Sequence, residues 1–354
     1  MNYEKIRSAF LPKADAAIIT SEVNRQYFTR FPATDGYLLI TADEVLLFAD
    51  SRYIEAAQRS AKNCDRILLY KGIEESLKPV LEQKGIKSLE AESDRLTVSE
   101  LRSLREKTGV DIVSEGGLDK AVDALRAVKD EEEISLIKQA QKIAENAFSH
   151  ILGFISTDRT EKEIALELDY YMLSHGADGI SFETIAVSGA NSSLPHGVPS
   201  DKKIENGDFI TMDFGAVVGG YHSDMTRTVA VGSVSEEQKR VYDTVLAAQH
   251  AGFSRLMPGV CARDADAAAR DVISQAGYGQ YFGHSLGHGV GVEIHEKPNL
   301  SPKSAAVLEK GNVVTNEPGI YIPGSFGVRI EDMALITEDG YENLTCCEKK
   351  LIIL

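Results

Sequence analysis

The stretch Phe209–Thr226, FITMDFGAVVGGYHSDMT, alternates apolar and polar residues on either side of a glycine-containing segment. Such a pattern is typical of two antiparallel strands joined by a turn. With the turn centred on Val218-Gly219, Asp213 and Asp224 are expected directly opposite each other, on one face of the sheet. Two carboxylates in that arrangement repel each other unless a cation lies between them. The alternative is a pair of solvated strand aspartates.

A second segment, nearer the C-terminus, repeats this arrangement. Residues 313–317 and 328–331 have the composition of strands and flank a loop that contains glycine and proline. A turn centred on Gly324 would bring Glu317 and Glu331 opposite each other. One opposed acidic pair arises easily by chance, whereas two hairpins that each present such a pair do not. The pattern therefore favours a cation site over four unrelated surface carboxylates.

The candidate nitrogen ligand lies in a glycine-rich segment. All eight histidines lie between His150 and His295, and residues 283–289 read GHSLGHG. Glycines let the backbone approach a neighbour closely, and either His284 or His288 can supply an imidazole nitrogen. Four carboxylates and one imidazole can hold two divalent ions. Such oxygen-rich ligation favours manganese, iron or cobalt over a structural zinc ion, which prefers thiolates.

The whole chain is predicted to form two domains. Residues 1–127 alternate strand-like and helix-like segments, and they contain neither a histidine nor a phosphate-binding glycine loop. Residues 128–354 contain glycine-punctuated strands and four predicted helices, which begin near Asp130, at the capping boxes of Thr160 and Ser235, and at Ala262. The expected fold class is α+β: an N-terminal α/β domain, then a domain in which a curved antiparallel sheet is flanked by helices.

Composition narrows the class of protein further. The chain has 354 residues, of which 43% are hydrophobic and 26% charged, with a formal net charge of −16. So acidic a surface repels phosphate backbones and anionic lipids, and neither nucleic acid nor a membrane is an expected partner. The four scattered cysteines form no disulfide framework, and the N-terminus lacks the pattern of a secretory signal. A cytoplasmic location is therefore expected.

Short strings around the candidate ligands carry a family resemblance. They read MDFG at 212–215, SDMTRT at 223–228, GHGVG at 287–291, NEPG at 316–319 and VRIED at 328–332. In order and context they resemble the ligand-bearing strings of the creatinase/methionine aminopeptidase-like family of dinuclear metallopeptidases. The resemblance covers essentially the whole chain and implies a creatinase-type N-terminal domain before a "pita-bread" catalytic domain. It also implies two divalent metal ions, manganese first with cobalt, iron or zinc as alternatives, held by Asp213, Asp224, His288, Glu317 and Glu331.

The resemblance assigns further roles around the metal ions. A hydroxide that bridges the ions attacks the peptide bond before proline, most simply in an Xaa-Pro dipeptide, while Glu317 carries the proton. His196 and His295 resemble the family's catalytic histidines and are expected to stabilise the oxyanion or to hold the substrate. Strand alternation adds two further candidates. Thr226, two residues after Asp224, shares its face and is expected to orient a metal-bound water, and Arg329, two residues before Glu331, either to fix a carboxylate ligand or to bind a substrate carboxylate. The family also implies a homodimer.

Other interpretations fit the sequence less well. Aminopeptidase P, which releases the N-terminal residue of longer Xaa-Pro peptides, is the near alternative. The creatinase branch lacks the metal ligands that are present here, and methionine aminopeptidases usually lack a large N-terminal domain. The string GHSLG at 283–287 matches the G-x-S-x-G motif of serine hydrolases, but the glycines after it would break the helix that this motif requires. A non-catalytic binding protein on the same fold would be expected to lose a ligand, and none is missing.

Overall fold

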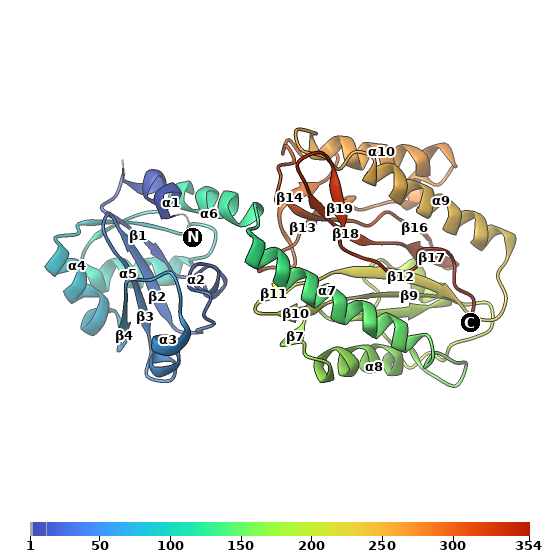
Figure 1. Ribbon diagram of the computed structural model, residues 1–354, viewed down its shortest axis with the longest axis horizontal. Helices are drawn as coiled ribbons and strands as arrows, with labels where there is room; N and C mark the ends of the chain where they lie inside the picture. The colour runs from blue at the N-terminus through green and yellow to red at the C-terminus, as the bar shows by residue number, and fades with distance from the viewer. Residues whose placement is uncertain (1–2, 12) are drawn as a thin grey trace. The chain divides into compact units, whose positions relative to one another are not determined.

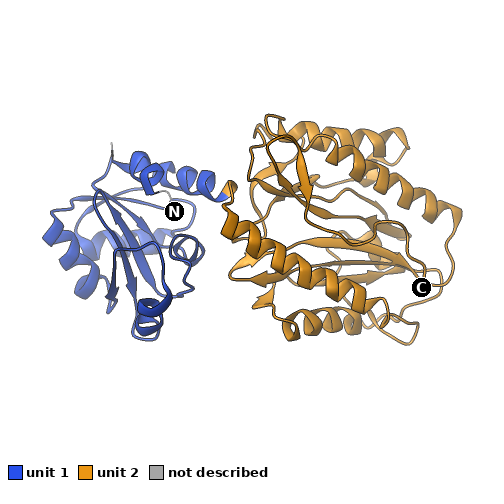
Figure 2. Ribbon diagram, in the orientation of Figure 1, with its two compact units in different colours: residues 1–126 blue, residues 127–354 orange. Residues whose placement is uncertain are grey.

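The computed structural model describes residues 3–11 and 13–354 (Figure 1). The chain divides into two compact units, Met1–Arg126 and Ala127–Leu354 (Figure 2). Within the described residues, no helix is both long and apolar enough to cross a membrane.

The first unit is an α/β domain with one mixed sheet, whose strand order is β4-β3-β2-β1-β5-β6. A hairpin predicted from the alternation of apolar residues is confirmed, since Leu39 of β2 pairs with Leu46 of β3. Buried side chains such as Ile18, Leu89 and Leu104 form the core of this unit. Its strands and helices are β1 (Ala16–Ile19), β2 (Gly36–Thr41), β3 (Val45–Ala49), β4 (Arg66–Leu69), β5 (Ser88–Ala91), β6 (Asp111–Val113), α1 (Tyr3–Phe10), α2 (Glu22–Thr29), α3 (Ile54–Ser60), α4 (Lys78–Lys84), α5 (Val98–Thr108) and α6 (Gly117–Ala127).

The second unit is α+β, with antiparallel strand pairs distributed over several small sheets. The capping boxes predicted at Thr160 and Ser235 are confirmed, and Asp130 closes a third box with Glu133. The helices of this unit are α7 (Glu131–Ile151), α8 (Glu161–Ser174), α9 (Glu236–Phe253) and α10 (Ala262–Gln275). Its strands are β7 (Gly179–Ile180), β8 (Ile185–Ser188), β9 (Phe209–Phe214), β10 (Ala216–Val218), β11 (Tyr221–His222), β12 (Met225–Ala230), β13 (Gly287–Gly289), β14 (Glu296–Leu300), β15 (Val313–Asn316), β16 (Gly319–Ile322), β17 (Phe326–Arg329), β18 (Asp332–Ile336) and β19 (Tyr341–Asn343).

Strand β9 lies between two pairs of helices (Figure 1). Ile210, Met212 and Phe214 belong to the buried cluster that α7 and α8 cover, whereas Phe209 belongs to the cluster that α9 and α10 cover. Successive side chains of a strand point to opposite faces. Asp213 therefore shares the face of Phe209 and points away from α7 and α8.

The register predicted for the first hairpin is wrong by two residues. Asp213 pairs with Thr226 rather than with Asp224. The reason is the turn, which is centred on Gly219 and Gly220, whose φ angles are 59° and 80°. Positive φ at both central residues is what a tight two-residue hairpin turn requires. Because the shift is an even number of residues, Asp224 stays on the same face as Asp213, as its diagonal neighbour.

The register predicted for the second hairpin is confirmed. Gly319 of β16 pairs with Arg329 of β17, and Asn316 of β15 pairs with Asp332 of β18. These two pairs follow one continuous register, so Glu317 and Glu331 lie opposite each other between them. The hairpin closes around Gly324, as predicted, since Ile322 pairs with Phe326.

Gly287 in β13 allows the neighbouring strand β15 to lie very close to it. A Cβ atom at this position would lie 2.1 Å from the carbonyl oxygen of Thr315 in the neighbouring strand. We expect Gly287→Ala to lower the free energy of unfolding by about 1–3 kcal/mol, because backbone atoms must move to relieve the clash. Urea denaturation measures this change. Gly283→Ala is the matched control, since its Cβ would meet nothing within 4 Å and it should be close to neutral.

Candidate functional site

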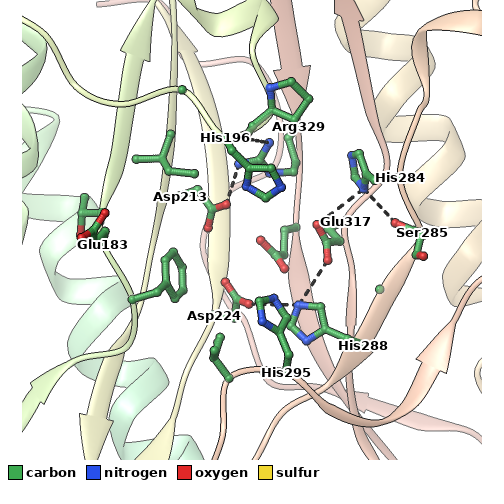
Figure 3. A pocket seen from close by; sticks show the side chains of 18 of the residues that line it. Glu183, His196, Asp213, Asp224, His284, Ser285, His288, His295, Glu317 and Arg329 are labelled. Carbon is green, nitrogen blue, oxygen red and sulfur yellow. Dashed lines mark hydrogen bonds and ion pairs between the residues drawn. The ribbon is translucent and has the colours of Figure 1, made fainter.

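A cavity of about 620 Å³ lies in the second unit and is lined by side chains from both hairpins (Figure 3). The structure brings eight of the nine predicted site residues to this cavity. The ninth, Thr226, is fully buried beside it. The eight predicted residues that line it are Asp213, Asp224, His288, Glu317, Glu331, His196, His295 and Arg329.

The core of the site is a group of carboxylates around His288. Its Nε2 atom lies 3.6 Å from Oδ2 of Asp224 and 3.4 Å from Oε1 of Glu317. Ligand atoms of Asp224, His288 and Glu331 all lie within 4.8 Å of one another, which is close enough to share one ion. Asp213 and Glu317 line the same cavity but lie outside this most compact group.

Hydrogen bonds from neighbouring strands fix the direction of these ligands. Thr226 donates from Oγ1 to Oε2 of Glu331 at 2.7 Å. Nδ1 of His288 lies 3.1 Å from the carbonyl oxygen of Gly289, so the ring donates there and turns the lone pair of Nε2 toward the carboxylates. Thr226 thus orients a candidate ligand directly, and its expected role in orienting a metal-bound water stays a prediction.

Arg329 is fully engaged by its neighbours. Nη2 donates to Oδ2 of Asp213 at 2.5 Å, Nε donates to Oγ1 of Thr226 at 3.0 Å, and Nη1 donates to the hydroxyl of Tyr321 at 2.8 Å. Of the two roles expected for Arg329, this geometry supports the fixing of a carboxylate. Oδ1 of Asp213 is buried and has no hydrogen-bond partner anywhere in the described part of the chain. That oxygen is free to bind a cation.

The metal-free cluster is electrostatically strained. Burial, together with Asp213 and Glu317, raises the pKa of Asp224 well above its usual range. Burial also raises the pKa of Glu331, with Asp224 and Glu317 adding repulsion. The pKa of Glu317 rises to about 8, mainly through burial, although Arg329 opposes that shift. Each shift means that burial and neighbouring carboxylates together disfavour the charged form more than Arg329 stabilises it.

Divalent cations fit this donor set. Carboxylate oxygens and one imidazole are the donors that manganese and similar ions accept, and no cysteine lines the cavity. Burial lowers the pKa of His288 to about 4, so its ring is neutral at pH 7, which is the form that binds a metal ion. The unpartnered oxygen of Asp213 and the raised pKa values of three carboxyls both point to missing positive charge at this place.

Two residues of the site were not assigned a role from the sequence. His284, considered with His288 as the nitrogen ligand but not chosen, lines the cavity, and its Nδ1 atom lies 4.0 Å from Oε2 of Glu317. Nε2 of His284 lies 2.9 Å from the hydroxyl of Tyr321, which links the ring to Arg329. The short spacing between His284 and His288 could have indicated that both rings belong to the same site. Nothing in the sequence pointed to Tyr321, whose ring reaches the cavity only because β16 pairs with β17.

The remaining histidines differ in their surroundings. His196 and His295 line the cavity, and the ring of His295 packs edge-on against that of His288 with centroids 4.3 Å apart. His222 instead bonds to Oγ of Ser181 and does not reach the cavity wall.

The serine-hydrolase motif is ruled out by local structure. The segment after Ser285 is strand β13 and not a helix, and His284 contacts the backbone carbonyl of Ser285.

Comparisons with known proteins show the family and the fold of the chain. Residues 135–338 match metallopeptidase family M24, and residues 12–128 match the creatinase/prolidase N-terminal domain. The chain is 40% identical over 339 residues to the Xaa-Pro dipeptidase of Pyrococcus horikoshii, which covers 96% of this chain and 94% of that protein. A solved Xaa-Pro dipeptidase from Bacillus anthracis is 44% identical with a TM-score of 0.94, covering 99% of this chain and 98% of that one. The X-Pro aminopeptidase from Thermotoga maritima is 38% identical with a TM-score of 0.91, covering 98% and 100%.

A buried group of carboxylates and one imidazole, open to a cavity on this two-unit fold, defines the protein as a metallopeptidase. The chain belongs to metallopeptidase family M24, and its first unit is a creatinase/prolidase N-terminal domain. The fold class expected from the sequence is confirmed by these matches and by the solved structures.

The raised pKa of Glu317 predicts how the metal-free protein responds to pH. The carboxyl titrates near its ordinary value of 4.5 in the unfolded chain and at about 8 in the folded one, so the folded state holds more protons between these limits. Stability of the metal-free protein therefore falls as pH rises through this window, by up to about 1.4 kcal/mol per pH unit for one group. Urea denaturation after treatment with a chelator measures this slope.

The control for this prediction is Glu317→Gln, which cannot titrate and should make the slope less steep, while Asp224 and Glu331, whose pKa values are also raised, still contribute to it. Saturating manganese should flatten it as well, because a bound cation favours the charged carboxylates. A metal-free stability that rises from pH 5 to pH 8 would contradict the expected sign.

Proposed function

We propose that this protein hydrolyses the peptide bond that precedes proline, chiefly in Xaa-Pro dipeptides, with two divalent metal ions as its cofactor. The observation that carries the proposal is the arrangement of four carboxylates and His288 around one cavity. The likeness to proteins named Xaa-Pro dipeptidase supports the substrate class. Manganese is the proposed metal, because the donors are mostly oxygen. Asp213, Asp224, His288, Glu317 and Glu331 are the proposed ligands.

The reaction follows from what each side chain can do. Divalent ions, when bound, polarise the scissile carbonyl and lower the pKa of water. Glu317 is placed to take a proton and to pass it to the proline nitrogen as the bond breaks, because its carboxylate lines the cavity, with Oε1 3.4 Å from Nε2 of His288. His196 and His295 are proposed to donate hydrogen bonds to the carbonyl oxygen or to hold the substrate.

Arg329 and Thr226 act through other side chains. Arg329 holds one oxygen of Asp213, which leaves the other oxygen turned to the site. Thr226 does the same for Glu331. Removing a hydrogen bond of this kind typically lowers metal affinity by about 10- to 100-fold.

Aminopeptidase P activity on longer Xaa-Pro peptides is the second candidate. The likeness to the X-Pro aminopeptidase from Thermotoga maritima favours it, at an identity close to that of the dipeptidases. A binding protein without catalysis is a remoter alternative. We also propose a cytoplasmic location and, from the family resemblance, a homodimer. The strongly acidic composition supports the further proposal that the protein binds neither nucleic acid nor membranes.

The choice between the two activities is tested with matched substrates. We expect the manganese-loaded protein to hydrolyse Ala-Pro with a higher kcat/KM than Ala-Pro-Ala, measured by release of free alanine. A strong preference for the tripeptide would replace the dipeptidase assignment with aminopeptidase P. No hydrolysis of either peptide with manganese, cobalt, iron or zinc would leave only the binding protein.

The ligand role of Asp213 is tested by substitution. Asp213→Ala removes one donor and leaves Arg329 without its carboxylate, so we expect loss of metal loading and at least a 1,000-fold lower kcat, as for other groups that act only as part of a catalytic unit (about 10³-fold or more). Bound metal is measured by elemental analysis, and circular dichroism checks that the fold survives. Asp201→Ala is the control, because this carboxylate is 87% exposed and lies outside the cavity. Full activity of Asp213→Ala would refute the assignment.

A further inference from the structure

One wall of the cavity carries a carboxylate that the proposed reaction does not use. Glu183 lies between β7 and β8, and it lines the cavity together with its neighbours Phe182 and Ile185. Both neighbours are partly buried, whereas Glu183 is exposed. This part of the cavity wall therefore presents an apolar surface, from Phe182 and Ile185, beside the negative charge of Glu183.

Glu183 differs from every other acidic side chain that lines the cavity. Asp213 is held by Arg329, Asp224 lies beside His288, and Glu317 and Glu331 accept hydrogen bonds from threonines. Within the residues that the structure describes, Glu183 has no hydrogen bond and no ion pair. Glu183 is therefore the lining carboxylate whose charge can pair with a cationic group of a ligand that enters the cavity.

The chemistry of the substrate decides which part of it can face Glu183. An Xaa-Pro dipeptide carries a carboxylate on proline, and a second carboxylate at close range would repel it. The α-ammonium of Xaa is separated from the scissile carbonyl only by the α-carbon, so it stays near the ligand cluster. Figure 3 shows Glu183 well to one side of Asp213 and Asp224, on the opposite side from Glu317 and His288. A long side chain on Xaa is the part of the substrate that can span this distance.

We propose that Glu183 selects substrates with a basic residue, lysine or arginine, immediately before proline. The aliphatic stem of such a side chain packs on Phe182 and Ile185, while its charged end pairs with Glu183. This inference rests on the proposed function and adds the class of the residue before proline. Glu183 is a specificity-determining residue here and takes no part in the proton transfer.

The experiment compares Lys-Pro with norleucine-Pro, which has a similar aliphatic side chain but no charge. With the manganese-loaded, full-length protein we expect kcat/KM to favour Lys-Pro by roughly fivefold, the factor that about 1 kcal/mol from one exposed ion pair supplies. Glu183→Gln should reduce this ratio to about one by lowering the value for Lys-Pro alone. Added salt should reduce the wild-type ratio too, since the pair is open to solvent. Glu183→Lys should instead favour Glu-Pro.

Glu205→Gln is the matched control, because Glu205 is also exposed but does not line the cavity, and it should leave the ratio unchanged. Equal rates for the two dipeptides with the wild-type protein would overturn the inference and leave the proposed function intact. An equal loss for both dipeptides in Glu183→Gln would overturn it as well, because it would indicate a structural role. Failure of the wild-type protein to hydrolyse either dipeptide, or any other Xaa-Pro peptide, would overturn the proposed function and this inference together.

Discussion

Repulsion among four carboxylates in one enclosed cavity is the constraint on which the rest of this molecule depends. Asp213, Asp224, Glu317 and Glu331 line the cavity with one guanidinium, that of Arg329, and among these four carboxylates it forms an ion pair with Asp213 alone. Low solvent access strengthens the repulsion, and the raised pKa values of three of these carboxyls show its direction. The folded chain can relieve it by keeping protons or by binding cations. Divalent ions relieve it more completely, because the carboxylates then retain their charge.

The scaffold must hold these groups together against that repulsion. Strand β9 does so by anchoring its opposite face, Ile210, Met212 and Phe214, in the core beneath α7 and α8. Behind Glu331, the buried side chain of Arg227 donates to the carbonyl oxygen of Glu331 at 2.6 Å and to Asp332 at 2.7 Å. Repelling side chains are therefore carried on backbone that is fixed by apolar packing and by a buried ion pair. An arrangement of this kind can keep its shape whether or not a cation is bound.

Sequence reasoning reached the fold and the members of the cluster but not all of its geometry. Helix starts followed from local chemistry, because the capping boxes of Thr160 and Ser235 depend on residues three apart. The first hairpin was predicted out of register, since alternation alone does not choose between Val218-Gly219 and Gly219-Gly220 as the turn. The bonds from Arg329 to Asp213 and Tyr321 join separate strands. Their partners depend on tertiary packing, which no short sequence window contains.

Arg329 also bears on why this cluster suits catalysis better than a purely structural ion. It opposes the rise in the pKa of Glu317 that burial and Asp213 promote, and so favours the charged carboxylate, which is the form that can accept a proton. A structural site needs no proton acceptor and closes around its ion. Here the cluster instead opens on a cavity of about 620 Å³, whose wall adds His196, which was not needed as a ligand.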